Sequence, residues 1–566
     1  MNRNAESHFS ELPHTEVNRS IFDRSHKHMT TGNIGDLIPF SCTEILPGDS
    51  VKITTSKVIR LQTLLTPIMD NIVADFFWFF VPMRLVWNHT KEFFGENTQS
   101  AWLPQTNYFM PQFINVGVNG AGIDPCTNAD YFGLPLSFRH TTGDVSSGSY
   151  VDCLRFRALT LIWNEFFRDE NLQDPAPLDI SDSNLTYDKT KPERGGVPFK
   201  VCKFHDYFSS ALPAPQKGPS VALPISGNIS ISGTLKTPDL AVFSASVDNT
   251  NLSTNPVRFV NMDVTGSAPV GINNGTFVSN ALGTYSDIYF SNLYTKSSNI
   301  NTSNLSVNLS NATMASVNDI RLAFQLQKFY EANARGGSRY IELIKQHFDV
   351  SSPDARLQRP EYLGGNRVPI TIHQITNNAE SSGAYLGNVG AMSVTSDISD
   401  DVEKSFTEHG YLIGCLCLRY QHSFQNGVDR SWMRRNREDF YWPLFAHLGE
   451  RGIKNGEIFW SSDPSVDNQV FGYQEAWAEY RYANNLVTGE FRSGISNTLD
   501  SWHLADDYSQ LPTLSSGWIQ EDKSNVDRVL AVTSLVSNQF FADIYVKNIM
   551  TRPMPMYSVP GLIDHL

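Results

Sequence analysis

The sequence has no long hydrophobic run. No stretch of about 18 apolar residues occurs in the 566-residue chain, and the strongest run, residues 74–82, contains Asp75 and Pro82. A membrane-spanning helix, and hence membrane insertion, is therefore not expected. The N-terminus also lacks the apolar segment of a signal peptide, so we expect the chain to stay in the reducing cytosol where it is made.

Cysteine is scarce and scattered. The six cysteines lie at positions 42, 126, 153, 202, 415 and 417. Cys415 and Cys417 are two residues apart, so they share one face of an expected strand. No further Cys/His pair at metal-binding spacing lies nearby. We predict buried free thiols, no metal site and no cofactor.

Charge is also low, at 18% of residues, and the net charge is −14. A freestanding nucleic-acid-binding protein is usually basic, so any contact with DNA requires a local patch. Aromatic residues make up 12%, which excludes wholesale disorder, and the 37 Gly and 29 Pro indicate many turns rather than a helical bundle. A large surface with few charges can be covered by protein neighbours.

Hydrophobic periodicity predicts a mainly β chain with helices in its connections. Residues 1–48 look like an extended arm, alternation begins at Ser50, and residues 76–81 look like a strand buried on both faces. Apolar residues recur at three and four positions over 153–170, which indicates an amphipathic helix. Further helices are predicted from 316 to 335 and from 339 to 348. The clearest later strands are predicted at 411–420 and 526–549.

Composition changes sharply within residues 219–316. Between Lys217 and Asp319 only seven residues are charged, and Ser, Thr, Asn and Gly alternate with dispersed small apolar residues. This alternation favours short exposed strands over a disordered linker. We interpret the segment as a β-rich insertion that stands off the main body.

Catalytic motifs are absent. The sequence has no phosphate-binding loop, no Gly-x-Ser-x-Gly elbow and no His-Glu-x-x-His. Glu408-His409 and His447 with Glu450 are possible acid–base pairs, but no nucleophile accompanies them. His14, His26 and His28 on the arm lack diagnostic metal spacing. We predict that the chain is not an enzyme.

The strongest basic cluster is Arg430-Ser-Trp-Met-Arg-Arg-Asn-Arg437, in which Arg430, Arg434, Arg435 and Arg437 flank Trp432. Arginines that neutralise phosphates beside an aromatic ring that stacks on bases are typical of single-stranded DNA binding. A network of salt bridges between subunits is the alternative interpretation, and we favour it because the chain is acidic overall and Arg suits interfaces. The arm offers a second candidate DNA-binding set, which consists of Arg19, Arg24 and Lys27. The same two interpretations, DNA binding and salt bridges between subunits, apply to it.

Several long motifs resemble the major capsid proteins of gokushoviruses, small single-stranded-DNA bacteriophages of the Microviridae. They include Arg19-Ser-Ile-Phe-Asp-Arg-Ser-His26, Ser352-Pro-Asp-Ala-Arg-Leu-Gln-Arg-Pro-Glu-Tyr-Leu-Gly-Gly365, Ser405-Phe-Thr-Glu-His-Gly-Tyr411, Ala478-Glu-Tyr-Arg-Tyr482 and the C-terminal residues 552–565. The matches cover both ends and most of the middle. The departures are Met29, where Lys is expected, and residues 219–316, which match nothing specific.

The resemblance implies an eight-stranded antiparallel jelly roll of the viral coat type, with long loop insertions that contain helices. It implies a T=1 icosahedral shell built from pentamers around a circular single-stranded DNA genome, assembled in the bacterial host cytoplasm and found in the virion. It further implies a small basic DNA-packaging protein and a pilot protein as partners. The insertion would form a protrusion at the three-fold axes and would contact a host surface receptor.

The expected organisation is an extended arm over 1–48, a first part of the jelly roll with a helical insertion over 49–218, the variable insertion over 219–316, and the helical connection, remaining core and C-terminal tail over 317–566. Residues 553–566 combine three prolines with several large apolar residues that a free tail would expose, so we predict that the tail lies against its own subunit or a neighbour. The alternatives are a carbohydrate-binding β-protein without catalytic activity and, with less support, a glycosidase on a β scaffold.

Overall fold

The computed structural model describes residues 18–96, 108–115, 122–139, 151–219, 221, 259–260, 272–273, 317–335, 346, 358–378 and 386–557. The chain divides into two compact units, one made of Met1–Pro219 with Phe329–Leu566 and the other of Ser220–Lys328. The described elements of the second unit are β9 (Phe259–Val260), β10 (Ile272–Asn273) and the first part of α5 (Val317–Arg335). Most of the predicted insertion lies outside the described residues.

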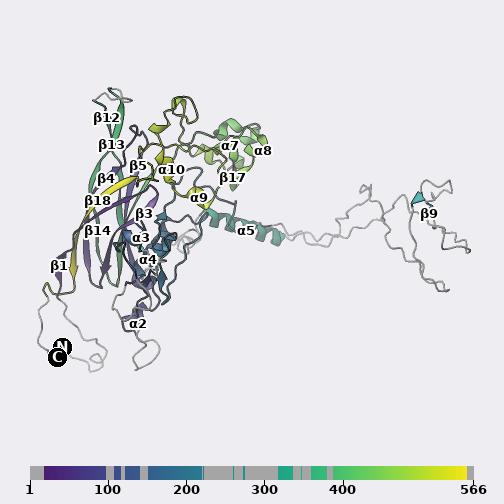
Figure 1. Ribbon diagram of the computed structural model, residues 1–566. Helices are drawn as coiled ribbons and strands as arrows, with labels where there is room; N and C mark the ends of the chain where they lie inside the picture. Colours follow the sequence, from purple (N-terminus) through teal and green to yellow (C-terminus); the bar gives the residue numbers. More distant parts are fainter. Residues whose placement is uncertain are drawn as a thin grey trace, which may run out of the picture. The chain divides into compact units, whose positions relative to one another are not determined.

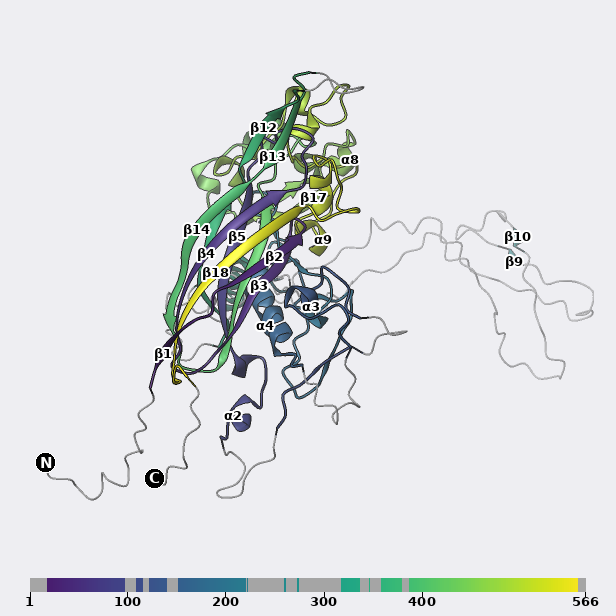
Figure 2. The same cartoon turned by 60° about the vertical axis from the view of Figure 1, so that its left-hand side comes forward.

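Two five-stranded antiparallel sheets form the body of the first unit (Figures 1 and 2). In sheet 1, β1 (Ser20–Asp23) and β2 (His26–Gly32) both pair with β18 (Phe540–Arg552), which is followed by β4 (Ser50–Leu61) and β14 (Thr395–Ser405). Sheet 2 has the order β11 (Glu361–Pro369), β5 (Ile72–Pro82), β15 (Gly410–Tyr420), β3 (Asp36–Ile45) and β8 (Phe199–Lys200). Figure 2 shows β14, β4, β18 and β2 side by side in this order.

The main core lies between the two sheets. Alternate residues of β4 and β18, such as Ile53 and Ile544, pack in one cluster with Phe76 and Trp78 of β5 and with Leu416 of β15. The period of two in the sequence therefore produces one buried face per strand in sheet 1. The opposite face of sheet 1 remains accessible, and its exposed residues include Lys52, Arg60 and Tyr545.

Sheet 2 is buried on both faces at its central strands β5 and β15, as predicted for residues 76–81. Its second face packs against α4 (Leu154–Ile162) and the following turn of π-helix, η4 (Trp163–Phe167). This confirms the amphipathic helix predicted over 153–170. Cys415 and Cys417 lie together in this second core and are free thiols, which confirms the sequence prediction.

Two expectations meet a different outcome. The stretch expected to be an arm outside the sheets forms β1, β2 and β3 from Ser20 onward. The strand expected over 526–549 begins only at Phe540, because α10 (Lys523–Asp527) and a loop with exposed apolar residues come first. The helix predicted from 316 to 335 is confirmed as α5, whereas the helix predicted at 339–348 lies outside the described residues apart from residue 346.

The connections carry short elements. They are α2 (Thr90–Phe93), α3 (Asn128–Tyr131), α7 (Asn455–Ile458), α8 (Pro464–Asp467), α9 (Ser516–Ile519) and the strand pairs β6–β7 (Phe113–Ile114, Leu185–Thr186), β12–β13 (Ile372–Thr376, Val389–Ser393) and β16–β17 (Glu450–Lys454, Val470–Glu475). Among the described residues, no helix combines the length and hydropathy needed to cross a membrane.

Candidate interaction surfaces

The predicted basic cluster folds into short 3-10 turns after β15, and its first arginine turns inward. Arg430 is only 8% exposed at the start of η8 (Arg430–Met433). Its Nη1 donates hydrogen bonds to the Gly452 carbonyl at 2.8 Å and to Glu457 Oε1 at 2.9 Å. Tyr207 Oη donates to the other oxygen of Glu457 at 2.8 Å. Arg430 thus completes a buried ion pair within its own subunit.

Arg434 also makes its contacts inside the chain. Its guanidinium lies 4.4 Å from the centre of the Tyr480 ring and 5.2 Å from that of Phe440, with Nη2 3.9 Å from Glu479 Oε1. A guanidinium stacked on aromatic rings beside a carboxylate orders the surrounding loops. Two of the four predicted DNA-contacting arginines therefore serve the subunit's own structure.

The remaining members of the cluster are exposed. The Trp432 side chain is 83% exposed, and Arg435 is exposed as well. Arg437 Nε donates to the neighbouring Glu438 at 2.7 Å on the surface, where such a pair contributes little stability. Trp432, Arg435 and Arg437 thus remain able to contact another molecule.

The second candidate set lies on an edge strand instead of a free arm. Arg19, Arg24 and Lys27 are all exposed along β1 and β2. The Arg24 backbone N–H donates to the Asn548 carbonyl at 2.8 Å, and Lys27 Nζ lies 2.8 Å from Asp543 of β18. Sheet 1 therefore fixes the backbone of Arg24 and the side chain of Lys27.

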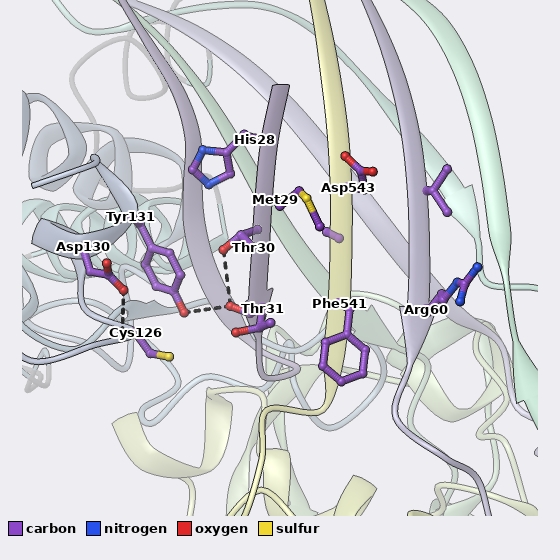
Figure 3. Close-up of a pocket in the computed structure, with 12 residues that line it drawn as sticks. His28, Met29, Thr30, Thr31, Arg60, Cys126, Asp130, Tyr131, Phe541 and Asp543 are labelled. Carbon is purple, nitrogen blue, oxygen red and sulfur yellow. Dashed lines mark hydrogen bonds between the residues drawn. The ribbon is translucent and has the colours of Figure 1, made fainter. Parts of the chain in front are cut away.

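A pocket of about 610 Å³ lies where β2 and β18 approach α3 (Figure 3). Tyr131 Oη donates to the Thr31 carbonyl at 3.0 Å, so this carbonyl points away from β18. The peptide groups of successive residues alternate in direction along a strand, so residues two apart point the same way. The N–H and C=O of Met29 therefore also point away from β18. Met29, Val58 and Phe541 supply an apolar lining. An open strand edge beside an apolar groove suits contact with protein rather than catalysis.

Among the described residues, no group of three His, Cys, Asp or Glu side chains could hold a metal ion. Burial raises the pKa of Cys153 to about 11 and that of Cys417 to about 12, which keeps these thiols protonated and unreactive.

The suggested acid–base pairs have structural partners. Glu408 accepts from Arg84 Nε at 2.8 Å, and the His409 ring stacks on Phe94 with ring centres 3.9 Å apart. Glu450 pairs with Arg335 of α5. Each carboxylate therefore balances an arginine, which agrees with the structural interpretation of these pairs.

A buried charged cluster escaped sequence analysis. His422 Nδ1 lies 2.9 Å from Asp506 Oδ1, and Nε2 lies 3.1 Å from Glu521 Oε1. Burial alone would lower the pKa of His422, but Asp506 and Glu521 outweigh burial and raise the pKa to about 9. Burial likewise opposes ionisation of Asp506, yet His422 and Lys203 hold the pKa of this carboxyl below its usual range. These residues are far apart in sequence and share no motif.

We expect this cluster to make stability fall in mildly alkaline solution. The folded-state pKa of His422 is raised from 6.5, so its contribution is complete below about pH 6.5 and is lost as pH rises toward about 9. Urea unfolding of the unassembled subunit at several pH values measures this loss. The His422→Gln variant should lose less stability across the same window, and equal losses in both proteins would contradict the assignment.

The chain was compared with known proteins. The family model described as "Capsid protein (F protein)" matches residues 10–562. The chain belongs to this capsid protein family. It is 37% identical to the capsid protein VP1 of Chlamydia phage 1, covering 98% of this chain and 97% of the relative, and 36% identical to that of Spiroplasma virus 4, covering 99% and 98%. The VP1 of Bdellovibrio phage phiMH2K is 34% identical over a similar share.

Family membership confirms the resemblance to gokushovirus major capsid proteins and the prediction of a capsid protein. A capsid protein has a structural role, assembles with copies of itself into a shell and is part of the virion. The family therefore favours the coat-protein hypothesis over the carbohydrate-binding alternative. Other copies of the chain are accordingly natural candidate partners of the interaction surfaces described above.

Proposed function

We propose that this chain is the major capsid protein of a T=1 icosahedral shell, built from pentamers, that encloses a circular single-stranded DNA genome. The observation that carries the proposal is the match to capsid proteins over nearly the whole chain. In this proposal the sandwich of two sheets forms the shell wall, and long connections supply the contacts between subunits. Assembly takes place in the cytoplasm of a bacterial host.

We further propose that the sandwich is a jelly roll. The two main sheets contain eight strands of seven residues or more, namely β2, β3, β4, β5, β11, β14, β15 and β18. Numbered one to eight along the chain, they have the spatial orders 1-8-3-6 and 5-4-7-2. This order supports two interlocked Greek keys, as in viral coat proteins.

DNA contact is proposed for the exposed basic set on the edge of sheet 1, namely Arg19, Arg24 and Lys27. The exposed Arg435 and Arg437 beside Trp432 are assigned to contact with protein instead. A small basic DNA-packaging protein would supply the positive charge that this acidic chain lacks, because phosphate neutralisation dominates binding to nucleic acid. A pilot protein is the other proposed viral partner.

Assembly of the purified chain tests the proposal. After expression in a bacterium, sedimentation velocity and negative-stain electron microscopy should show closed, uniform shells. A chain that stays monomeric under all conditions that preserve its fold would contradict the proposed function and would favour the carbohydrate-binding alternative.

We propose that residues 219–316 form a three-fold protrusion that contacts a host receptor. Replacement of 225–312 by a short Gly/Ser linker should leave shell assembly intact and strongly reduce adsorption of the particles to host cells. The reason is that the body of the first unit has its own core, which does not depend on this segment. Adsorption assays with matched particle numbers measure the effect. Normal attachment of the altered particles would contradict the receptor role.

A further inference from the structure

The loops after β15 expose several large apolar side chains. We call this set the aromatic surface: Trp432, Phe440, Tyr441, Trp442, Leu444 and Tyr480. Leu444, in η10 (Pro443–Phe445), is 87% exposed, and the other five are between about two-fifths and four-fifths exposed. The rings of Tyr441 and Tyr480 lie 6.1 Å apart. Exposed apolar clusters on this scale usually mark interaction sites.

The aromatic surface is held rigid from below. The Arg434 guanidinium lies between the Phe440 and Tyr480 rings and close to Glu479. Trp442 Nε1 donates to the Arg437 carbonyl at 2.9 Å, and Tyr480 Oη accepts from the Tyr441 backbone N–H at 3.3 Å. Side chains ordered before binding lose little conformational freedom on binding, so the surface is pre-organised for a partner.

We infer that the aromatic surface binds a second copy of this chain in the shell. The inference rests on the proposed function, because it supplies one of the contacts that shell assembly requires. Trp, Tyr and Arg are the residues that dominate protein–protein hot spots, and here they occur in the same loops as an exposed leucine. A capsid protein assembles with copies of itself, so a second copy of the chain is a partner that every shell supplies.

Charge and shape favour protein over DNA at this surface. Arg430 and Arg434 already pair with Glu457 and Glu479, and Arg437 pairs with Glu438. Within the part of the chain that the structure describes, only Arg435 of this basic cluster has no carboxylate partner. A single guanidinium neutralises few phosphates, and the aliphatic Leu444 offers no ring on which a base could stack. A protein partner can contact both the Arg435 guanidinium and the Leu444 side chain.

Two substitutions and a matched control test the inference. Leu444→Asp and Trp432→Ala should each reduce the yield of shells at least tenfold while the subunit keeps its circular dichroism spectrum. Leu535→Asp is the control, because Leu535 is 92% exposed in the loop before β18, outside the aromatic surface. The control should assemble normally. Normal yields from both surface variants, or an equal loss in the control, would overturn the inference.

Hydroxyl-radical labelling of the unaltered chain gives a second readout that needs no variant. Oxidation of Trp432 and Trp442 should fall severalfold when subunits assemble into shells without DNA, because a neighbouring subunit covers both rings. Unchanged oxidation would overturn the inference, as would protection that appears only when DNA is added, which would assign the surface to the genome. Failure of the unaltered chain to form any shells would contradict the proposed function itself.

Discussion

Replacement of Asp506 by Ala is expected to destabilise the subunit by about 3–5 kcal/mol. Asp506 is buried between His422 and Lys203, whose charged atoms lie 2.9 and 3.5 Å from its oxygens. Removal of this carboxylate leaves two cations in a poorly solvated site with Glu521 as their remaining close anion. The cost comes mainly from the charges left without a partner and less from the lost hydrogen bonds.

Asp507 provides the matched control for this prediction. It is the next residue, it is exposed, and its side chain accepts one hydrogen bond from Asn426 Nδ2 at 3.2 Å. Asp507→Ala should change the free energy of unfolding by no more than about 0.5 kcal/mol. Urea unfolding of both variants at pH 7 makes the comparison. Equal effects of the two substitutions would show that the buried cluster contributes nothing specific.

Deletion of residues 553–566 is expected to abolish shell formation and to leave the subunit folded. β18 ends at Arg552, which pairs with Asp49 at 3.2 Å and donates to the Glu44 carbonyl at 2.6 Å. Beyond this anchor the chain exposes apolar side chains, and Tyr557 is 76% exposed. Residues 558–566 lie outside the described part. Burial of this tail against a neighbouring subunit would remove apolar surface from water.

Sedimentation and electron microscopy of the truncated chain measure this effect. A variant that keeps the tail but changes Met554, Met556 and Tyr557 to Ser separates apolar contact from mere length, and it should also assemble poorly. Circular dichroism confirms that each protein is folded. Normal particles from the truncated chain would show that the tail takes no part in assembly.

The local hydrophobic pattern was sufficient to predict a helix or strand where burial against the core shapes the sequence of that element. The helix predicted over 153–170 was found because burial of one face imposes a period on the sequence. The strand at 411–420 is buried on both faces and is marked by an almost continuous apolar run. The continuous apolar run at 76–81 correctly indicated burial on both faces. Asp75, just before this run, accepts hydrogen bonds from Arg367 and Arg419 on the two neighbouring strands, which are distant in the sequence.

The hydrophobic pattern did not predict strands whose pairing partners are distant in the sequence. β1 and β2 form an edge strand with exposed and partly buried residues in alternation, so hydrophobic contrast is too weak to identify a strand. Their position comes from β18, more than 500 residues away in the sequence. Residues 528–539 are rich in β-branched and apolar residues, yet turns and exposed Leu535 and Val536 precede β18.

The candidate sites follow the same rule. Sequence analysis found the basic cluster but could not separate Arg430 and Arg434 from Arg435 and Arg437, because their carboxylate partners lie up to 49 residues away. The His422 cluster was missed for the same reason, since Asp506 is 84 residues from His422. A site formed by residues that are far apart in the sequence has no local motif by which the sequence could predict it.

An electron cryo-microscopy map of particles formed by the full chain tests the central claim most directly. The proposal predicts a closed T=1 shell in which the two sheets fit the wall density and each aromatic surface lies against a neighbouring subunit. A map of any other assembly, or one in which the sandwich does not form the wall, would contradict it.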